Sequence, residues 1–175
     1  MHVNYALRRG VALIRLNSGP INALGFDLRC DILRSIDKAI KDRAIAIVLC
    51  GAGRNFSAGA DIAEFARKKH LQTPTLNEVI AILDEMSIPT IAGINGFALG
   101  GGLELSLACH YRLADNTARM GLPEVHLGIL PGAGGTQRLP RLTGIPTALD
   151  MMTSGRHITS QEGLSYGILD GLLIN

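Results

Sequence analysis

The chain has 175 residues, of which 47% are apolar and 18% are charged, and its formal net charge is +2. This composition fits one folded domain with a substantial core, and it excludes a disordered tail or a highly charged binding arm. The charge is too small to indicate nucleic-acid binding, and no apolar segment is long enough to predict a membrane span.

Strand-like and helical patterns alternate through the first part of the sequence. Residues 11–16 form an apolar stretch typical of a strand, which we expect to pair with residues 3–7 across the turn at 8–10. Residues 26–40 carry apolar side chains at helical spacing, with charged residues on the opposite face. The continuous apolar run 44–50 is typical of a strand that is covered on both faces.

The alternation continues to the end of the chain. A glycine-rich loop is expected at residues 51–61, before an amphipathic helix at 76–86 and a strand at 90–94. This order of elements predicts one α/β layered domain with a mainly parallel sheet. The remaining predicted elements are an apolar helix at 100–108, a strand at 111–114, and short helical pieces at 136–142, 146–153 and 160–166.

Three dispersed cysteines bear on the cellular compartment. Cys30, Cys50 and Cys109 are widely spaced and lie among apolar residues. This pattern favours buried free thiols in a reducing compartment over a disulfide framework or a metal site.

Small residues dominate the stretch between the strand at 44–50 and the next helix. They allow a ligand to approach the backbone closely, and the N–H of Ala58 is expected to donate to a ligand oxygen. Asp61 is suited to cap the following helix. Taken alone, this stretch is better explained as an ordinary strand–turn–helix connection.

A second motif, residues 95–104, places three glycines at the start of the apolar helix. Free backbone N–H groups at the positive end of a helix dipole can stabilise an oxyanion that develops on a carbonyl. Glu104 lies three residues after Gly101 and therefore on the same helical face. Because this helix is apolar nearly all round, a solvent-facing glutamate is a weaker interpretation than an acid/base group.

A third motif, residues 120–136, presents another carboxylate among apolar and turn residues. Glu124 and Glu104, each beside a glycine-rich turn, could share one proton-transfer task. A metal site with Glu124, His126 and His110 is a weak alternative, since no third ligand has a recognised spacing. His126 is better explained as a structural residue.

Other motif matches carry no function. Residues 163–167 fit the nucleophile-elbow pattern, but they lie in a helical segment and no histidine follows to complete a triad. The glycine pairs at 51–53 and 132–134 lack the third glycine of a dinucleotide fingerprint, and no phosphate-binding loop is present. The sequence therefore does not support an NAD or ATP site.

Taken together, residues 57–61, 96–104 and 122–136 closely resemble the crotonase (enoyl-CoA hydratase/isomerase) superfamily. Each stretch alone is modest, but the three in this order and spacing are highly specific, and the resemblance runs from Val11 to the end. Within the superfamily, the stretches 121–125, 139–144 and 153–156 are most similar to the N-terminal hydratase/isomerase domain of peroxisomal bifunctional enzymes. A 3-hydroxyacyl-CoA dehydrogenase domain follows that domain in those enzymes.

The resemblance implies a fold, an activity and roles for particular residues. The implied fold is the α/β crotonase fold of stacked ββα units, here a single domain over residues 1–175 that we expect to be incomplete, because the C-terminal helical segment of the family is missing. The implied activity is hydration of trans-2-enoyl-CoA to 3-hydroxyacyl-CoA in fatty-acid β-oxidation. The implied oxyanion-hole donors are the N–H groups of Ala58 and Gly101. The implied catalytic acid/base residues are Glu104 and Glu124. The resemblance also implies that Gly59, Ala60 and Asp61 contact the substrate.

The same motifs are compatible with more than one activity and location. An isomerase that moves a Δ3 double bond to Δ2 with Glu124 alone, or a non-catalytic acyl-CoA-binding homologue, would share these motifs. No metal and no cofactor are implied, since coenzyme A is part of the substrate. A peroxisomal location follows from the resemblance alone, with mitochondrion or cytoplasm as alternatives. The motifs leave the acyl chain length and the oligomeric state undetermined, and a longer form of the chain could carry the dehydrogenase domain.

Overall fold

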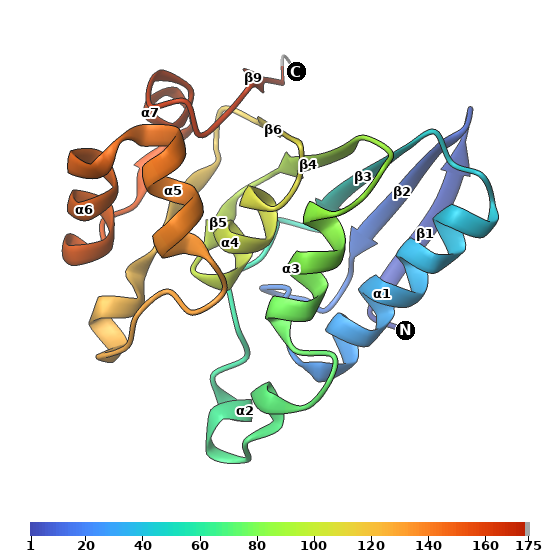
Figure 1. Cartoon of the computed structure of the whole chain (residues 1–175), viewed down its shortest axis with the longest axis horizontal. Coiled ribbons are helices and arrows are strands. Elements are labelled where there is room, and N and C mark those ends of the chain that lie inside the picture. Colours follow the sequence, from blue (N-terminus) through green and yellow to red (C-terminus); the bar gives the residue numbers. More distant parts are fainter. Residues whose placement is uncertain (174–175) are drawn as a thin grey trace.

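A six-stranded sheet forms the centre of the computed structural model, which describes residues 1–173 (Figure 1). The last two residues of the predicted domain, 174 and 175, lie outside the described part. The first two strands form the predicted antiparallel hairpin, and every later neighbour in the sheet is parallel. The strands in spatial order are β1 (Val3–Arg8), β2 (Val11–Leu16), β3 (Ala46–Gly51), β4 (Thr90–Ile94), β6 (Tyr111–Ala114) and β9 (Gly171–Leu172).

A second, three-stranded sheet was not predicted from the sequence. It consists of β5 (Phe97–Leu99), β7 (Arg119–Gly121) and β8 (Ile158–Thr159), in that order. Strands of two or three residues are too short to show an alternating pattern, so only tertiary pairing reveals them. An isolated parallel bridge between Ser57 and Ala98 attaches the glycine-rich loop to this sheet.

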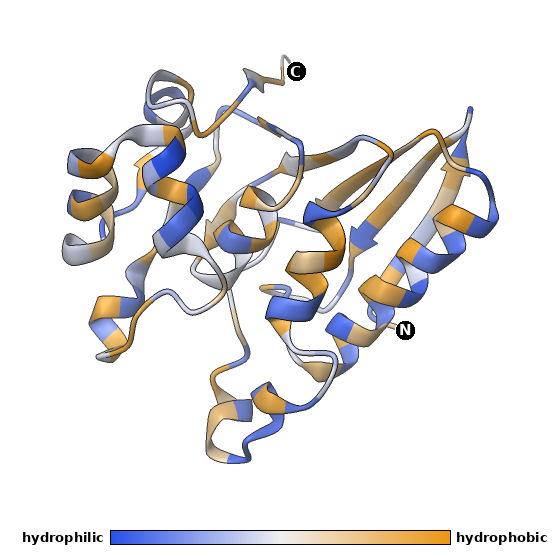
Figure 2. Ribbon diagram, in the orientation of Figure 1, coloured by the Kyte–Doolittle hydropathy of each residue, from blue (hydrophilic) through white to orange (hydrophobic). Residues whose placement is uncertain are grey.

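Three helices lie on one face of the large sheet: α1 (Phe26–Lys41), α3 (Leu76–Asp84) and α4 (Gly101–Leu107) (Figure 1). The apolar side of α1 carries the buried Leu28, Ile32 and Ile36, and its polar side faces outward (Figure 2). The helix α3 begins with a capping box between Thr75 and Glu78, which satisfies two backbone N–H groups at its start. The predicted amphipathic helices are therefore confirmed.

The other helical segments are short and lie toward the edges of the molecule (Figure 1). α2 and η1 project from the body of the molecule, whereas α5, α6 and α7 gather beside the second sheet. The three predicted helical pieces, at residues 136–142, 146–153 and 160–166, are confirmed as α5, α6 and α7. The bounds are α2 (Ala63–Ala66), η1 (Lys69–Leu71), η2 (Pro123–Leu127), α5 (Gly135–Thr143), α6 (Ile145–Ser154) and α7 (Ser160–Ser165).

The helix α4 runs through the core, and every one of its residues is buried, as its apolar composition predicts. Its glycines permit close packing: a Cβ atom on Gly102 would overlap the carbonyl oxygen of Ser57. The start of α4 is thereby pressed against the loop that follows β3. In the part of the chain that the structure describes, no helix has both the length and the hydropathy needed to cross a bilayer.

Candidate active site

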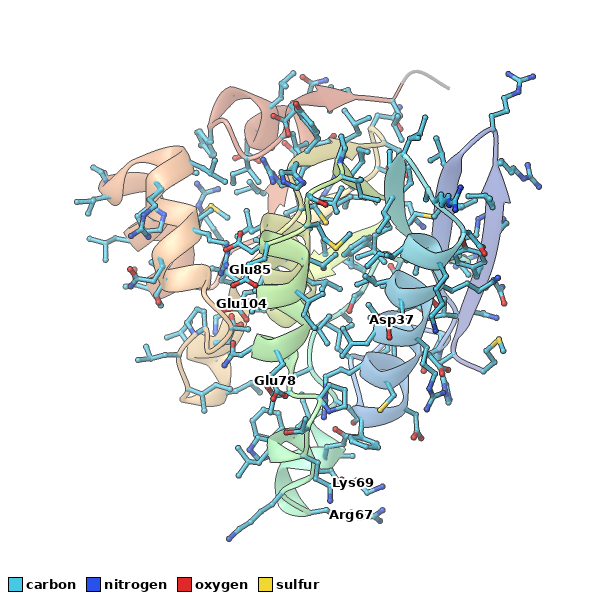
Figure 3. The ribbon with its side chains drawn as sticks, turned by 45° about the vertical axis from the view of Figure 1, so that its right-hand side comes forward. Asp37, Arg67, Lys69, Glu78, Glu85 and Glu104 are labelled. Atoms are coloured by element: carbon cyan, nitrogen blue, oxygen red, sulfur yellow. The ribbon has the colours of Figure 1, made fainter. Side chains whose placement is uncertain are left out.

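A cavity of about 640 Å³ opens where the start of α4 meets the loop after β3. η2 and the residues after it form one side of this cavity, and the segment from Ile62 to Asn77 forms another. Most lining side chains are apolar, and two carboxylates, Glu104 and Glu124, are the acidic groups that line it. Figure 3 shows Glu104 inside the molecule beside α3. An apolar cavity with a few converging polar groups is the usual form of a small-molecule site.

Hydrogen bonds fix the loop after β3 against residues 21–24. The Ser57 hydroxyl donates to the carbonyl of Asn22 at 2.8 Å and accepts the N–H of Gly59 at 3.2 Å. The N–H of Leu24 donates to the carbonyl of Gly59 at 2.8 Å. Ser57 and Asn22 are fully buried, so this network holds the backbone of the loop in one conformation.

The prediction that Ala58 supplies a free donor is wrong. Its N–H already donates to the carbonyl of Ile21 at 2.9 Å, so it is not available to a ligand. By contrast, the N–H groups of Ala60 and Gly101 make no hydrogen bond within residues 1–173, and both residues line the cavity. An ideal Cβ on Gly101 would lie 3.4 Å from the Ala60 nitrogen, so these two free amides are neighbours.

Glu104 is buried on α4 with one carboxylate oxygen fixed by two backbone donors. Its Oε1 accepts the N–H of Ala133 at 2.7 Å and the N–H of Gly135 at 2.8 Å. Burial raises the pKa of Glu104 above its ordinary value, although these N–H groups and the charge of Arg138 oppose the rise. Ala133, in the loop before α5, and Gly135, the first residue of α5, thus orient this carboxyl group in the cavity wall.

Glu124 lies on η2, opposite the start of α4, and one of its oxygens has no partner. An ideal Cβ on Gly100 would lie 3.0 Å from Glu124 Oε1, and Gly100 has a φ of 52°, which favours glycine there. Oε2 is buried and has no hydrogen-bond partner among the described residues. Burial raises the pKa of Glu124 to about 7; its own backbone N–H opposes this rise, and the Glu104 charge adds to it.

The other predicted binding residues divide into two groups. Gly59 and Ala60 line the cavity, so they are placed where a ligand could reach them. Asp61 is not among the lining residues, and its Oδ1 accepts the N–H of Ala63, the first residue of α2, at 3.0 Å. The expected N-cap role of Asp61 is not confirmed either, because the N-cap of α2 is Ile62 and this helix has no side-chain cap hydrogen bond.

The sequence did not single out several residues that complete the site. The segment before α3 contributes Phe65, His70 and Leu71, and α1 contributes Arg29. An exposed aromatic residue on a short amphipathic segment gives no signal of a ligand without the fold. Within residues 1–173, no three His, Cys, Asp or Glu side chains gather closely enough to hold a metal ion.

Comparisons with known proteins agree on one family. The family model described as enoyl-CoA hydratase/isomerase matches residues 6–173. The peroxisomal bifunctional enzyme of Danio rerio is 50% identical over 165 residues, and the match covers 94% of this chain and 23% of that protein. The peroxisomal fatty acid beta-oxidation multifunctional protein MFP2 of Arabidopsis thaliana is 40% identical over 172 residues, covering 94% and 24%. The chain thus spans about a quarter of the length of these two relatives.

A solved structure confirms the predicted fold class. The enoyl-CoA hydratase from Thermoplasma volcanium superimposes with a TM-score of 0.93 at 34% sequence identity. The match covers 100% of this chain and 73% of that one. The α/β crotonase fold, predicted from three short motifs, is therefore the fold of this chain.

Proposed function

We propose that this chain, which belongs to the enoyl-CoA hydratase/isomerase (crotonase) family, catalyses the hydration of trans-2-enoyl-CoA to 3-hydroxyacyl-CoA. One observation carries the proposal: two free, adjacent backbone N–H groups and two buried carboxyl groups line the same apolar cavity. The N–H pair suits a thioester carbonyl, and the carboxyl pair suits the addition of water beside it.

The thioester oxygen is placed between the N–H groups of Ala60 and Gly101. In this position both donors stabilise the negative charge that develops on the oxygen as the β-carbon is attacked. Gly101 is the first residue of α4, so the positive end of the helix dipole adds to the stabilisation. Removal of one such donor typically raises the barrier by about 2.7–4 kcal/mol.

Glu104 and Glu124 take the two proton transfers. Glu104, oriented by Ala133 and Gly135, accepts a proton from the water whose oxygen bonds to the β-carbon. Glu124, with a pKa of about 7, is partly protonated near neutral pH and delivers its proton to the α-carbon. The carbon–carbon double bond becomes a single bond, and the two carboxyl groups then exchange their protons with solvent.

Two single substitutions test the assignment. We expect Glu104→Gln and Glu124→Gln each to lower kcat for hydration by about 10²–10⁴-fold, the usual contribution of general acid–base catalysis. The loss of absorbance of a 2-enoyl thioester measures hydration, and calorimetry with a saturated acyl-CoA measures binding. Affinity should change little in either variant. If both variants still hydrate at the parent rate, the assignment is wrong.

Isomerisation of a 3-enoyl-CoA to the 2-enoyl-CoA is a second candidate activity. Glu124 favours it, because a buried oxygen without a partner and a pKa near neutrality suit one group that removes and returns a proton. Formation of 2-enoyl thioester absorbance from a 3-enoyl substrate measures this reaction. Isomerisation that survives in Glu104→Gln while hydration is lost would support a single-glutamate isomerase. Acyl-CoA affinity without either reaction would instead support a non-catalytic binding protein.

The names of the two relatives described above support a place for this chain in peroxisomal fatty-acid oxidation. A 3-hydroxyacyl-CoA dehydrogenase in a longer form of the chain would be consistent with this placement, since it would consume the hydration product. Co-sedimentation of the native protein with a peroxisomal marker, and not with mitochondrial or cytosolic markers, checks the location.

A further inference from the structure

One wall of the cavity is a segment with little packing of its own. Residues 62–75, here called the wall segment, include α2 and η1, and neither of these elements has a buried residue. The wall segment nevertheless supplies Ile62, Phe65 and Leu71 to the cavity lining. Since few apolar contacts hold it, some other interaction must fix its distance from the rest of the cavity.

Arg29 on α1 provides that interaction. Its side chain is 2% exposed, and its guanidinium contacts the wall segment at three points. Nε donates to the carbonyl of Pro74 at 2.8 Å, Nη2 to the carbonyl of Lys69 at 3.1 Å, and Nη1 lies 3.2 Å from Glu64 Oε2. Nη1 also donates to the carbonyl of Leu24 at 2.8 Å, which ties the cluster to the body of the fold.

Glu64 completes the connection from the other side. Its Oε1 accepts the N–H of Phe26, the first residue of α1, at 2.7 Å. One carboxylate of the wall segment thus joins both the start of α1 and the buried guanidinium. Only a planar guanidinium reaches these acceptors together, so lysine cannot reproduce the set of contacts.

We infer that Arg29 is a positioning residue that holds the wall segment over the cavity and thereby limits the length of acyl chain that the cavity accepts. This inference rests on the proposed function for the nature of the ligand. Three of the five side chains that the wall presents to the cavity, Ile62, Phe65 and Leu71, are apolar and match an acyl chain in chemistry; the other two are His70 and Thr75. If the contacts of Arg29 are lost, the wall moves outward, short chains lose their contacts with it, and longer chains gain room.

The main test compares Arg29→Lys with the parent chain on crotonyl-CoA and on a trans-2-hexadecenoyl thioester. We expect KM for crotonyl-CoA to rise by about tenfold, equivalent to 1.4 kcal/mol, with kcat little changed. The ratio of kcat/KM values should shift toward the long substrate. Equal losses on both substrates, or no change on either, would overturn the inference.

Limited proteolysis gives a second measurement that does not depend on activity. Arg67, Lys68 and Lys69 are exposed in the wall segment, and Figure 3 shows Arg67 and Lys69 at its tip. In Arg29→Lys, cleavage by trypsin after these residues should become about tenfold faster, because local opening governs cleavage. Mass spectrometry identifies the fragments. An unchanged cleavage rate would contradict the positioning role even if the chain proves not to be a hydratase.

Arg112→Lys is the matched control. Arg112 is also a buried arginine, 6% exposed, and it donates to the carbonyls of Cys109 and Ile168, away from the cavity lining. This variant should lose stability without changing the substrate ratio or the cleavage at residues 67–69. Should Arg29→Lys fail to fold, Glu64→Gln removes the ion pair and is expected to show the same shifts to a smaller degree. Parent-like behaviour of Glu64→Gln in both measurements would then overturn the inference.

Discussion

Glu104 and Glu124 line the same cavity, but among the described residues only Glu104 accepts hydrogen bonds from backbone N–H groups of another segment. Glu104 Oε1 accepts two N–H groups, whereas Glu124 Oε2 is buried without a partner in the described part of the chain. The charge of Glu104 also raises the pKa of Glu124. This asymmetry favours ionisation of Glu104 over ionisation of Glu124. It therefore suits Glu104 as the base and Glu124 as the acid.

The pH dependence of hydration should report the Glu124 proton. Glu124 must be protonated to act as the acid, and its pKa is about 7, so kcat/KM should fall as the pH rises through that value. Steady-state rates measured from roughly pH 5 to roughly pH 9 follow this limb on both sides of the Glu124 pKa. In Glu104→Gln, carbon NMR of the Glu124 carboxyl should show a lower pKa, because the neighbouring negative charge is gone. An unchanged pKa would mean that the two groups are not coupled.

Stability should depend on pH through the same residue. Because the pKa of Glu124 is raised from 4.5 to about 7, the folded state binds its proton more tightly than the unfolded state. This contribution to stability is fully present below about pH 4.5 and is lost as the pH rises through 7, by at most about 3.4 kcal/mol at 1.36 kcal/mol per pH unit, and by less where solvent screens the charge. Glu124→Gln should therefore unfold at higher denaturant concentration than the parent at pH 8, with a smaller difference at pH 5. The exposed Glu85, changed to Gln, serves as the control.

An amide-to-ester replacement separates the two candidate donors of the loop. Replacing the N–H of residue Ala60 by an ester oxygen should lower kcat by about 10²–10³-fold, the usual effect of losing one oxyanion donor. The same replacement at Ala58 removes a hydrogen bond to Ile21 and should mainly reduce the free energy of unfolding. If the replacement at Ala58 lowers kcat more than the replacement at Ala60 does, then Ala58 is the oxyanion donor, as the sequence predicted.

Gly101→Ala should impair catalysis more than folding. The added methyl group would lie 3.4 Å from the Ala60 nitrogen and 2.8 Å from Leu76 Cδ2, in the space between the two donors. The end of the Leu76 side chain can shift, and alanine is favourable in a helix, so the melting temperature should change little. Displacement of the thioester oxygen should lower kcat/KM by about 10²-fold. Gly19→Ala is the control, since a Cβ there meets nothing within 4 Å.

Much of the architecture follows from patterns that are local in the sequence. Hydrophobic periodicity located α1, α3 and the long strands, because a residue's burial in such elements repeats every 3.6 or 2 positions. The relation between Gly101 and Glu104 was also local, since a helix places residues three apart on one face. The burial of Glu104 followed from the apolar residues around it.

Tertiary structure decided what local patterns could not. Ala58 and Ala60 are both small residues in one loop, and only the carbonyl of Ile21, brought there by the fold, shows which N–H is engaged. The approach of Glu124 to the start of α4, and the three contacts of Arg29 with the wall segment, likewise join residues far apart in the chain. Periodicity determines which faces are buried, whereas the partner of each buried polar group depends on distant segments, and that pairing determines which groups remain free to bind and react.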